Sequence, residues 1–237
     1  MRGIPLCCLV LLIVAFHGAP AGAQGYPGGA GGGVPPITGS GGRTPQIEEV
    51  PNTPLEVKPD KAASKAYAAG LKTMAKAHEL EETVASATDP DKKAKAISKL
   101  EDTYGKALDQ FTEVLRNKND MYDAWNKVGY VHLRFGAYRE ALDDYNHALA
   151  LKPDLLEAIQ HRAEANLGVD RLDEAKAAYM DLYYHARPLA DQLMVSMQAW
   201  LKSHRNAANG VRAADIDAFD KWLQERDGIA KTAASGN

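Results

Sequence analysis

The feature of the sequence that most limits the possible folds is the spacing of small and aromatic residues between positions 122 and 155. Three small residues would let two antiparallel helices approach closely, and two aromatic residues would fill the space beside that contact. A proline after the second helix would end it. The residues expected to form this repeat core are Trp125, Gly129, Ala141, Tyr145, Ala148 and Pro153. The segment therefore predicts a helical hairpin.

This spacing resembles the tetratricopeptide repeat, a unit of 34 residues that folds as a helix, a turn and a second helix. Counted from Tyr122, the aromatic, small and proline positions of the repeat are matched, and Val128 keeps the apolar character of the seventh position. His132, at the eleventh position, departs from the tyrosine expected there. The resemblance implies a stack of helical hairpins that binds other proteins rather than catalysing a reaction.

A second, degenerate copy of the repeat is predicted over residues 156–189. The positions that match are Ala163, Ala175 and Tyr179, and those that depart are Arg162, Asn166 and Leu182. Residues 60–121 are predicted to form a helical extension with a degenerate first repeat, in which Ala107 and Phe111 match. Gly70, the candidate small residue of its first helix, lies too far from Ala107 for a repeat of normal length. Both helices of this copy are therefore expected to be longer.

The sequence from residue 60 onward predicts an all-α fold, a short tetratricopeptide helical-hairpin solenoid of about three repeats. Residues 190–237 are expected to form C-terminal capping helices and a frayed tail, because a stack of repeats needs a covered end. Leu193, Met197 and Trp200 lie on one face of the first of these helices. Helices are expected near residues 60–86, 91–117, 121–135, 138–151, 155–168, 171–186, 189–205 and 213–230.

Residues 1–23 have the features of a secretory signal peptide: Arg2, an apolar run from Ile4 to Phe16, and the triplet Ala21-Gly22-Ala23. A helix over that run would span about 20 Å, whereas the hydrocarbon core of a bilayer is about 30 Å thick. Cleavage is therefore expected to leave an exported protein, periplasmic or secreted, with no integral membrane span. An uncleaved anchor is the alternative.

Residues 24–59 are predicted to form a disordered arm, because 16 of these 36 residues are glycine or proline. Such a segment has too little apolar surface to bury against the entropy of ordering it.

Composition argues against several classes of function. The 28 basic and 31 acidic side chains give a net charge of −3, which does not favour nucleic acid as a partner. The two cysteines, Cys7 and Cys8, lie in the predicted signal peptide, which argues against a disulfide scaffold, a cysteine metal site and a cysteine nucleophile. No two histidines have the spacing that would place a pair of metal ligands on one helical face. No metal, cofactor or catalytic residue is therefore expected.

A polar stripe on the predicted 121–135 helix lies opposite its core face. The resemblance implies that this stripe, continued in the next copy, lines the groove in which a peptide lies. The residues assigned to this peptide groove are Asp123, Asn126, Tyr130, Leu133, Arg134, Glu157, Gln160 and Glu164. Asp143 and Asp144 are expected to be exposed on the outer face of the 138–151 helix.

Together these features predict an exported, non-catalytic protein-interaction module that binds a peptide or a partner protein in the groove of its repeats. A self-associating structural or assembly factor of the cell envelope, which would form homo-oligomers, is the first alternative. An enzyme whose catalytic residues are distant in sequence and converge only in the fold is the second.

Overall fold

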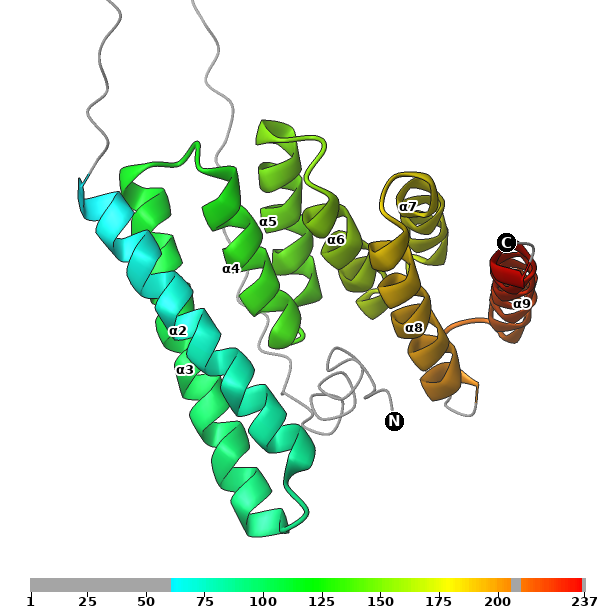
Figure 1. Ribbon diagram of the computed structural model, residues 1–237, viewed down its shortest axis with the longest axis horizontal. Helices are drawn as coiled ribbons and strands as arrows, with labels where there is room; N and C mark the ends of the chain where they lie inside the picture. Colours follow the sequence, from blue (N-terminus) through cyan, green and yellow to red (C-terminus); the bar gives the residue numbers. More distant parts are fainter. Residues whose placement is uncertain (1–60, 206–209, 236–237) are drawn as a thin grey trace, which may run out of the picture. The chain divides into compact units, whose positions relative to one another are not determined.

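The computed structural model describes residues 61–205 and 210–235, and the predicted signal peptide (1–23) and arm (24–59) lie outside the described residues. Within these ranges the fold is all-α, with eight helices and no strand (Figure 1). The helices are α2 (Lys61–Ser86), α3 (Pro90–Asn117), α4 (Tyr122–Arg134), α5 (Tyr138–Leu151), α6 (Leu156–Gly168), α7 (Leu172–His185), α8 (Arg187–His204) and α9 (Ala213–Ser235). This arrangement confirms the predicted fold class, a stack of helical hairpins.

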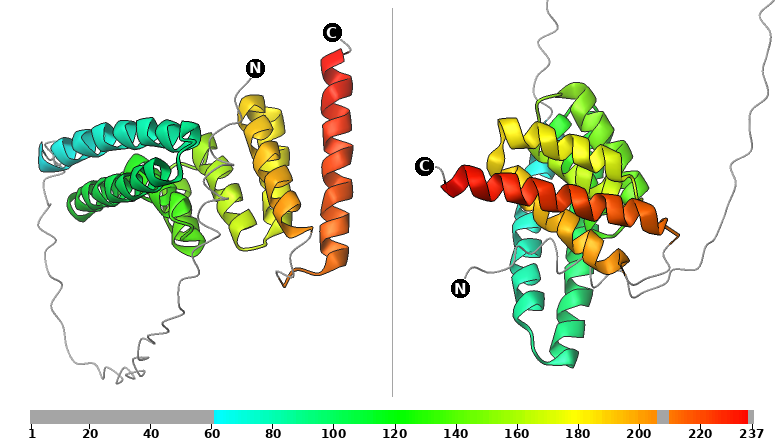
Figure 2. Two further views of the ribbon diagram at one scale, coloured as in Figure 1. Left: turned by 90° about the horizontal axis from the view of Figure 1, so that it is seen from below. Right: turned by 90° about the vertical axis from the view of Figure 1, so that its right-hand side faces the viewer.

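Each helix packs against the next one along the chain, and two further contacts join α4 to α6 and α6 to α8. The first hairpin, formed by α2 and α3, has much longer helices than the hairpins α4–α5 and α6–α7 (Figures 1 and 2). The contacts of α4 with α6 and of α6 with α8 make the first helices of these hairpins neighbours in the stack. This adjacency decides where their polar side chains lie.

Capping residues and turn residues with a positive φ determine where several of the helices begin and end. At the start of α3, the Asp89 side chain accepts a hydrogen bond of 2.8 Å from the backbone N–H of Lys92, and Pro90 occupies the first turn. The turn after α4 needs a positive φ, which Gly136 supplies at 73°. The turn after α6 uses the same geometry at Asp170, with a φ of 60°. The two hairpins thus keep one turn geometry although only one of them has glycine.

The small residues of the predicted repeat core lie where two helices touch. Ala141, Tyr145 and Ala148 are fully buried, and Gly129 is buried with the ring of Tyr145 against its Cα. Of the two remaining core residues, Trp125 is only partly buried and stacks on His147 with ring centres 4.5 Å apart, and Pro153 is exposed after the end of α5. The first hairpin repeats this contact, since the ring of Phe111 lies against Gly70.

A Gly129→Leu substitution is expected to lower the free energy of unfolding by about 1–3 kcal/mol, because it overpacks this contact. A Cβ atom at Gly129 would lie 2.9 Å from Cε1 of the buried Tyr145 ring, closer than carbon atoms pack. Leucine's higher helix propensity, about 1 kcal/mol, opposes this loss only in part. Chemical denaturation measures the change. Gly105→Leu is the control, since no atom lies within 4 Å of a Cβ placed there, and an equal loss in both variants would contradict this account.

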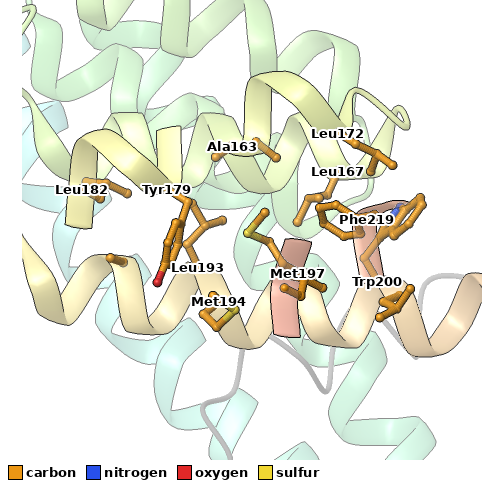
Figure 3. Packing of buried hydrophobic residues seen from close by; sticks show 14 residues of the cluster. Ala163, Leu167, Leu172, Tyr179, Leu182, Leu193, Met194, Met197, Trp200 and Phe219 are labelled. Atoms are coloured by element: carbon orange, nitrogen blue, oxygen red, sulfur yellow. The ribbon is translucent and has the colours of Figure 1, made fainter. Parts of the chain in front are cut away.

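The α6–α9 part of the stack has its own apolar core. Tyr179, Leu182, Leu193 and Met197 are at most 1% exposed, and Phe219 of α9 packs against them beside Trp200 (Figure 3). Helices α8 and α9 therefore cover the apolar face of the last hairpin.

Candidate functional site

The first helices of the hairpins, together with α8, carry a row of polar residues, most of which contact a member of the row on a neighbouring helix. We call this row the polar seam. Its members are Glu81 of α2, Asn126, Tyr130 and Arg134 of α4, Gln160, His161 and Glu164 of α6, and Gln192 and Ser196 of α8.

At the α2 end of the polar seam, Glu81 and Arg134 form a buried ion pair. Glu81 is 4% exposed and Arg134 is 7% exposed. The hydroxyl of Tyr104 donates a 2.7 Å hydrogen bond to the same carboxylate oxygen of Glu81. Burial, together with the neighbouring Tyr130 phenol, raises the pKa of Tyr104 far above its usual value, so this group stays a donor. The cluster ties α2, α3 and α4 together.

Tyr130 occupies the middle of the polar seam and is partly exposed. Its ring lies edge-on to His78 of α2, with centres 5.9 Å apart, and to His161 of α6, with centres 5.1 Å apart. The guanidinium of Arg134 lies 5.8 Å from the centre of the same ring. Tyr130 therefore bridges three successive first helices.

His161 is held neutral. Burial, helped by the nearby cations Lys127 and Arg134, lowers the pKa of its imidazole to about 3. Its Nδ1 is buried and has no hydrogen-bond partner among the described residues. An imidazole in this position cannot accept a proton without a large cost in stability.

Because the pKa of His161 is lower in the folded chain than in an unfolded one, its effect on stability has a definite sign. The folded state binds fewer protons, so this group lowers the free energy of unfolding as the pH falls below about 6.5. Between pH 7 and pH 5 the loss amounts to about 2 kcal/mol. A His161→Gln variant should lack it, and denaturation of both proteins at the two pH values measures the difference. Equal pH dependence in the two proteins would contradict the burial of a neutral imidazole.

At the α8 end, polar side chains of α6 and α8 bond to each other. The Ser196 hydroxyl, 1% exposed, donates a 2.8 Å hydrogen bond to Glu164 Oε1, and Gln160 Nε2 donates to Gln192 Oε1 at 3.3 Å. Glu164 and Gln160 are themselves 4% and 3% exposed. Helix α8 thus covers the polar face of α6.

The residues assigned to the peptide groove divide into two groups. Five are buried: Asn126, Leu133, Arg134, Gln160 and Glu164. Three remain at least partly exposed: Asp123, Tyr130 and Glu157. The stripe predicted from helical angles is therefore largely an internal contact between neighbouring helices. Binding of a peptide along it remains a prediction.

Asn126 differs from the other buried members of the polar seam. Its side-chain amide makes no hydrogen bond to any described residue, and its Oδ1 is buried. A buried amide without a partner is unusual in a folded protein, because an unmade hydrogen bond costs about 1–3 kcal/mol. It lies one helical turn before Tyr130, on the same face of α4. The two residues together present an unsatisfied amide beside a partly exposed aromatic ring.

Four members of the polar seam were not predicted from the sequence: Glu81, His161, Gln192 and Ser196. Glu81 lies 53 positions before its partner Arg134, and Ser196 lies 32 positions after Glu164. No local spacing pattern connects residues so far apart. The only signal in the sequence was a polar residue, Glu81 or Ser196, at a helical position that otherwise belongs to the apolar face.

One prediction about the outer helix is wrong. Asp144, expected to be exposed, is 7% exposed, and its carboxylate lies 2.6 Å from Nδ1 of His132. This hydrogen bond raises the pKa of His132. Asp143 is exposed, as expected. The histidine that departs from the repeat pattern thus has the buried carboxylate as its partner.

In the ranges 61–205 and 210–229, no group of three metal-ligating side chains comes together. No helix among those described has a stretch long and apolar enough to cross a membrane.

No protein-family model matches the chain. Its sequence is 27% identical over 119 residues to the photosystem I assembly protein Ycf3 of Acaryochloris marina (strain MBIC 11017), an alignment that covers 45% of this chain and 72% of that protein. This similarity and the all-helical hairpins together fit a tetratricopeptide-repeat family.

Proposed function

We propose that this protein is a non-catalytic interaction module that binds an extended segment of a partner protein along α4 and α6, and that it serves in the assembly of a protein complex. The observation that carries the proposal is the unsatisfied amide of Asn126 beside the partly exposed ring of Tyr130. An amide can both donate to and accept from an extended peptide backbone. Because Asn126 is 3% exposed, such a ligand must displace the side chains that cover it. The similarity to a protein named as an assembly protein supports the second part.

The kind of segment follows from what the other residues already bind. Arg134 is paired with Glu81, so it offers no free charge to an acidic peptide. Tyr130 offers an aromatic face with a polar tip, which suits apolar side chains of the ligand. We therefore propose a segment recognised through its backbone and an apolar side chain rather than through its charge.

The test is to select peptides from a random phage-displayed library on the chain and to measure their affinity for two variants. Asn126→Leu removes the amide but keeps its size, and replacing an unsatisfied polar group with an apolar one should not destabilise the fold. Together with Tyr130→Ala it should weaken peptide binding at least tenfold, equivalent to about 1.4 kcal/mol. Asp143→Ala, on the outer helix, is the control and should change nothing.

Two results would contradict the proposal: library peptides that bind the double variant Asn126→Leu, Tyr130→Ala as tightly as the parent chain, or no enrichment of any peptide. Light scattering over a range of concentrations addresses the alternative. A mass that rises with concentration in the absence of peptide would favour self-association through the repeats.

Export also belongs to this proposal. It is supported by the order of charged, apolar and small residues in positions 1–23. Mass spectrometry of the mature protein tests it, since a chain that begins at Gln24 is expected and one that retains Cys7 and Cys8 would contradict it.

A further inference from the structure

A second surface, away from the polar seam, has the properties of a binding site. An open cleft of about 470 Å³ lies where α5 and α7 both pack against α6. Leu142, Ile159 and Ala163 contribute apolar surface to it, and Asn146, Arg162 and Asn166 contribute polar groups. The three helices and their order along the chain can be followed in Figure 1.

The internal repeat explains why this cleft is open. In the preceding copy, the equivalent space is filled by two side-chain pairs, the stack of Trp125 on His147 and the hydrogen-bonded pair of His132 and Asp144. At 34 positions further along the chain, Ile159 and Asp181 correspond to Trp125 and His147. Asn166 and Ala178 correspond to His132 and Asp144. Each pair is thereby replaced by side chains that are smaller or do not bond to each other. The space they leave is the cleft, and all four residues line it.

The same comparison shows that the charge of the site has changed. Val128 of the preceding copy is buried and apolar, and its counterpart is Arg162. Asp143 and Asp144 have as counterparts Ala177 and Ala178. The copy with the cleft has therefore gained a cation on α6, and its facing helix has lost two carboxylates and gained one, Asp181 in place of His147.

Arg162 has no anionic partner within the described part of the chain. Its Nη1 donates a hydrogen bond of 3.1 Å to the amide oxygen of Asn146, and no carboxylate forms an ion pair with it. The side chain is partly buried, and burial lowers the pKa of the guanidinium. Asn166 is 7% exposed, and no described residue is bonded to its side chain. A partly desolvated cation and an unused amide thus face the same space.

The cleft also carries charges that limit its ligand. Arg171 lines it without an ion pair to any described residue, and so does Glu174. Asp181 is engaged by His185, at 3.1 Å from its Nδ1. The two carboxylates offset the two guanidiniums that line the cleft, so the cleft has no net charge to attract a strongly acidic ligand, and a single carboxylate is favoured only in contact with Arg162.

We propose that this cleft binds one acidic side chain, glutamate or aspartate, of a partner protein segment whose other residues are neutral. The carboxylate takes the place that Asp144 takes in the preceding copy, and Arg162 and Asn166 bond to it. The apolar surface of Ile159 and Leu142 receives the methylene groups of the same side chain. This site is separate from the face of α4 and α6 assigned above to backbone recognition, and it goes beyond that function.

The experiment compares two heptapeptides, acetylated and amidated at their ends, with either glutamate or glutamine between two runs of three alanines. Binding to the full chain is followed by NMR through the Nε–Hε signal of Arg162. The glutamate peptide is expected to shift this signal and to bind at least tenfold more tightly than the glutamine peptide. Raising the salt concentration from about 0.05 to 0.5 M should weaken the binding, because a partly exposed ion pair is screened.

Two variants and a control locate the site. Arg162→Gln should abolish the preference for glutamate, and Ala178→Asp should do the same by supplying a carboxylate from the chain itself, as Asp144 does in the other copy. Arg139→Ala, an exposed cation on α5 outside the cleft, should leave the affinity unchanged within twofold.

Three results would overturn the proposal: no response to the glutamate peptide at millimolar concentration, equal binding of the two peptides, or a preference that survives in both cleft variants. Inorganic phosphate is tested alongside. A shift caused by phosphate but not by the glutamate peptide would mean that the cleft holds a small anion and not an acidic side chain. Asn126→Leu should leave the glutamate preference intact, which separates this site from the proposed peptide-binding face.

Discussion

Replacement of Arg134 by methionine is expected to lower the free energy of unfolding by about 3–5 kcal/mol. It leaves the carboxylate of Glu81, only 4% exposed, without its positive partner. Removing one member of a buried ion pair costs this much because the remaining charge is neither solvated nor paired. Chemical denaturation with a two-state fit measures the loss.

Two further variants test the cause of that loss. Combining Arg134→Met with Glu81→Gln removes the stranded charge but keeps an acceptor for the Tyr104 hydroxyl, so most of the stability should return. Arg116→Met is the matched control, because the pair between Arg116 and Glu113 is exposed and should contribute less than about 1 kcal/mol. A small loss in Arg134→Met, or no recovery in the double variant, would mean that the pair does not hold α2 to α4.

Replacement of Phe219 by alanine is expected to cost about 3–5 kcal/mol, the usual range for removing a fully buried aromatic side chain. Phe219 is 0% exposed and meets Trp200 edge to face, with ring centres 5.4 Å apart. Loss of this contact should loosen α9 and expose apolar surface of α7 and α8. Denaturation measures the cost, and light scattering should detect increased self-association.

The control for this prediction lies on the same helix. Ile229 of α9 is 47% exposed, so Ile229→Ala should change the stability by no more than about 0.5 kcal/mol. If both substitutions had equally small effects, α9 would not act as a cap on the stack.

The amino-acid sequence alone predicted the secondary structure and the repeat, because both depend on residues that are close in sequence. The spacing of Gly129, Ala141 and Tyr145 predicted a hairpin, and in the structure Gly129 of α4 lies against the ring of Tyr145 of α5 and Ala141 is fully buried. Helical periodicity separates two faces of each helix, and that separation is also local.

The tertiary structure decided whether the polar side of each helix is buried against another helix or exposed. Helical angles place Arg134 on the polar side of α4, and Gln160 and Glu164 on the polar side of α6, but they do not show which helix covers either side. Arg134 is buried because α2 is long enough to bring Glu81 to it, and Glu164 is buried because α8 places Ser196 against it. The open cleft at Arg162 likewise depends on three helices meeting around smaller side chains. Partners of this kind are separated by tens of residues, so only the packing of complete helices brings them together.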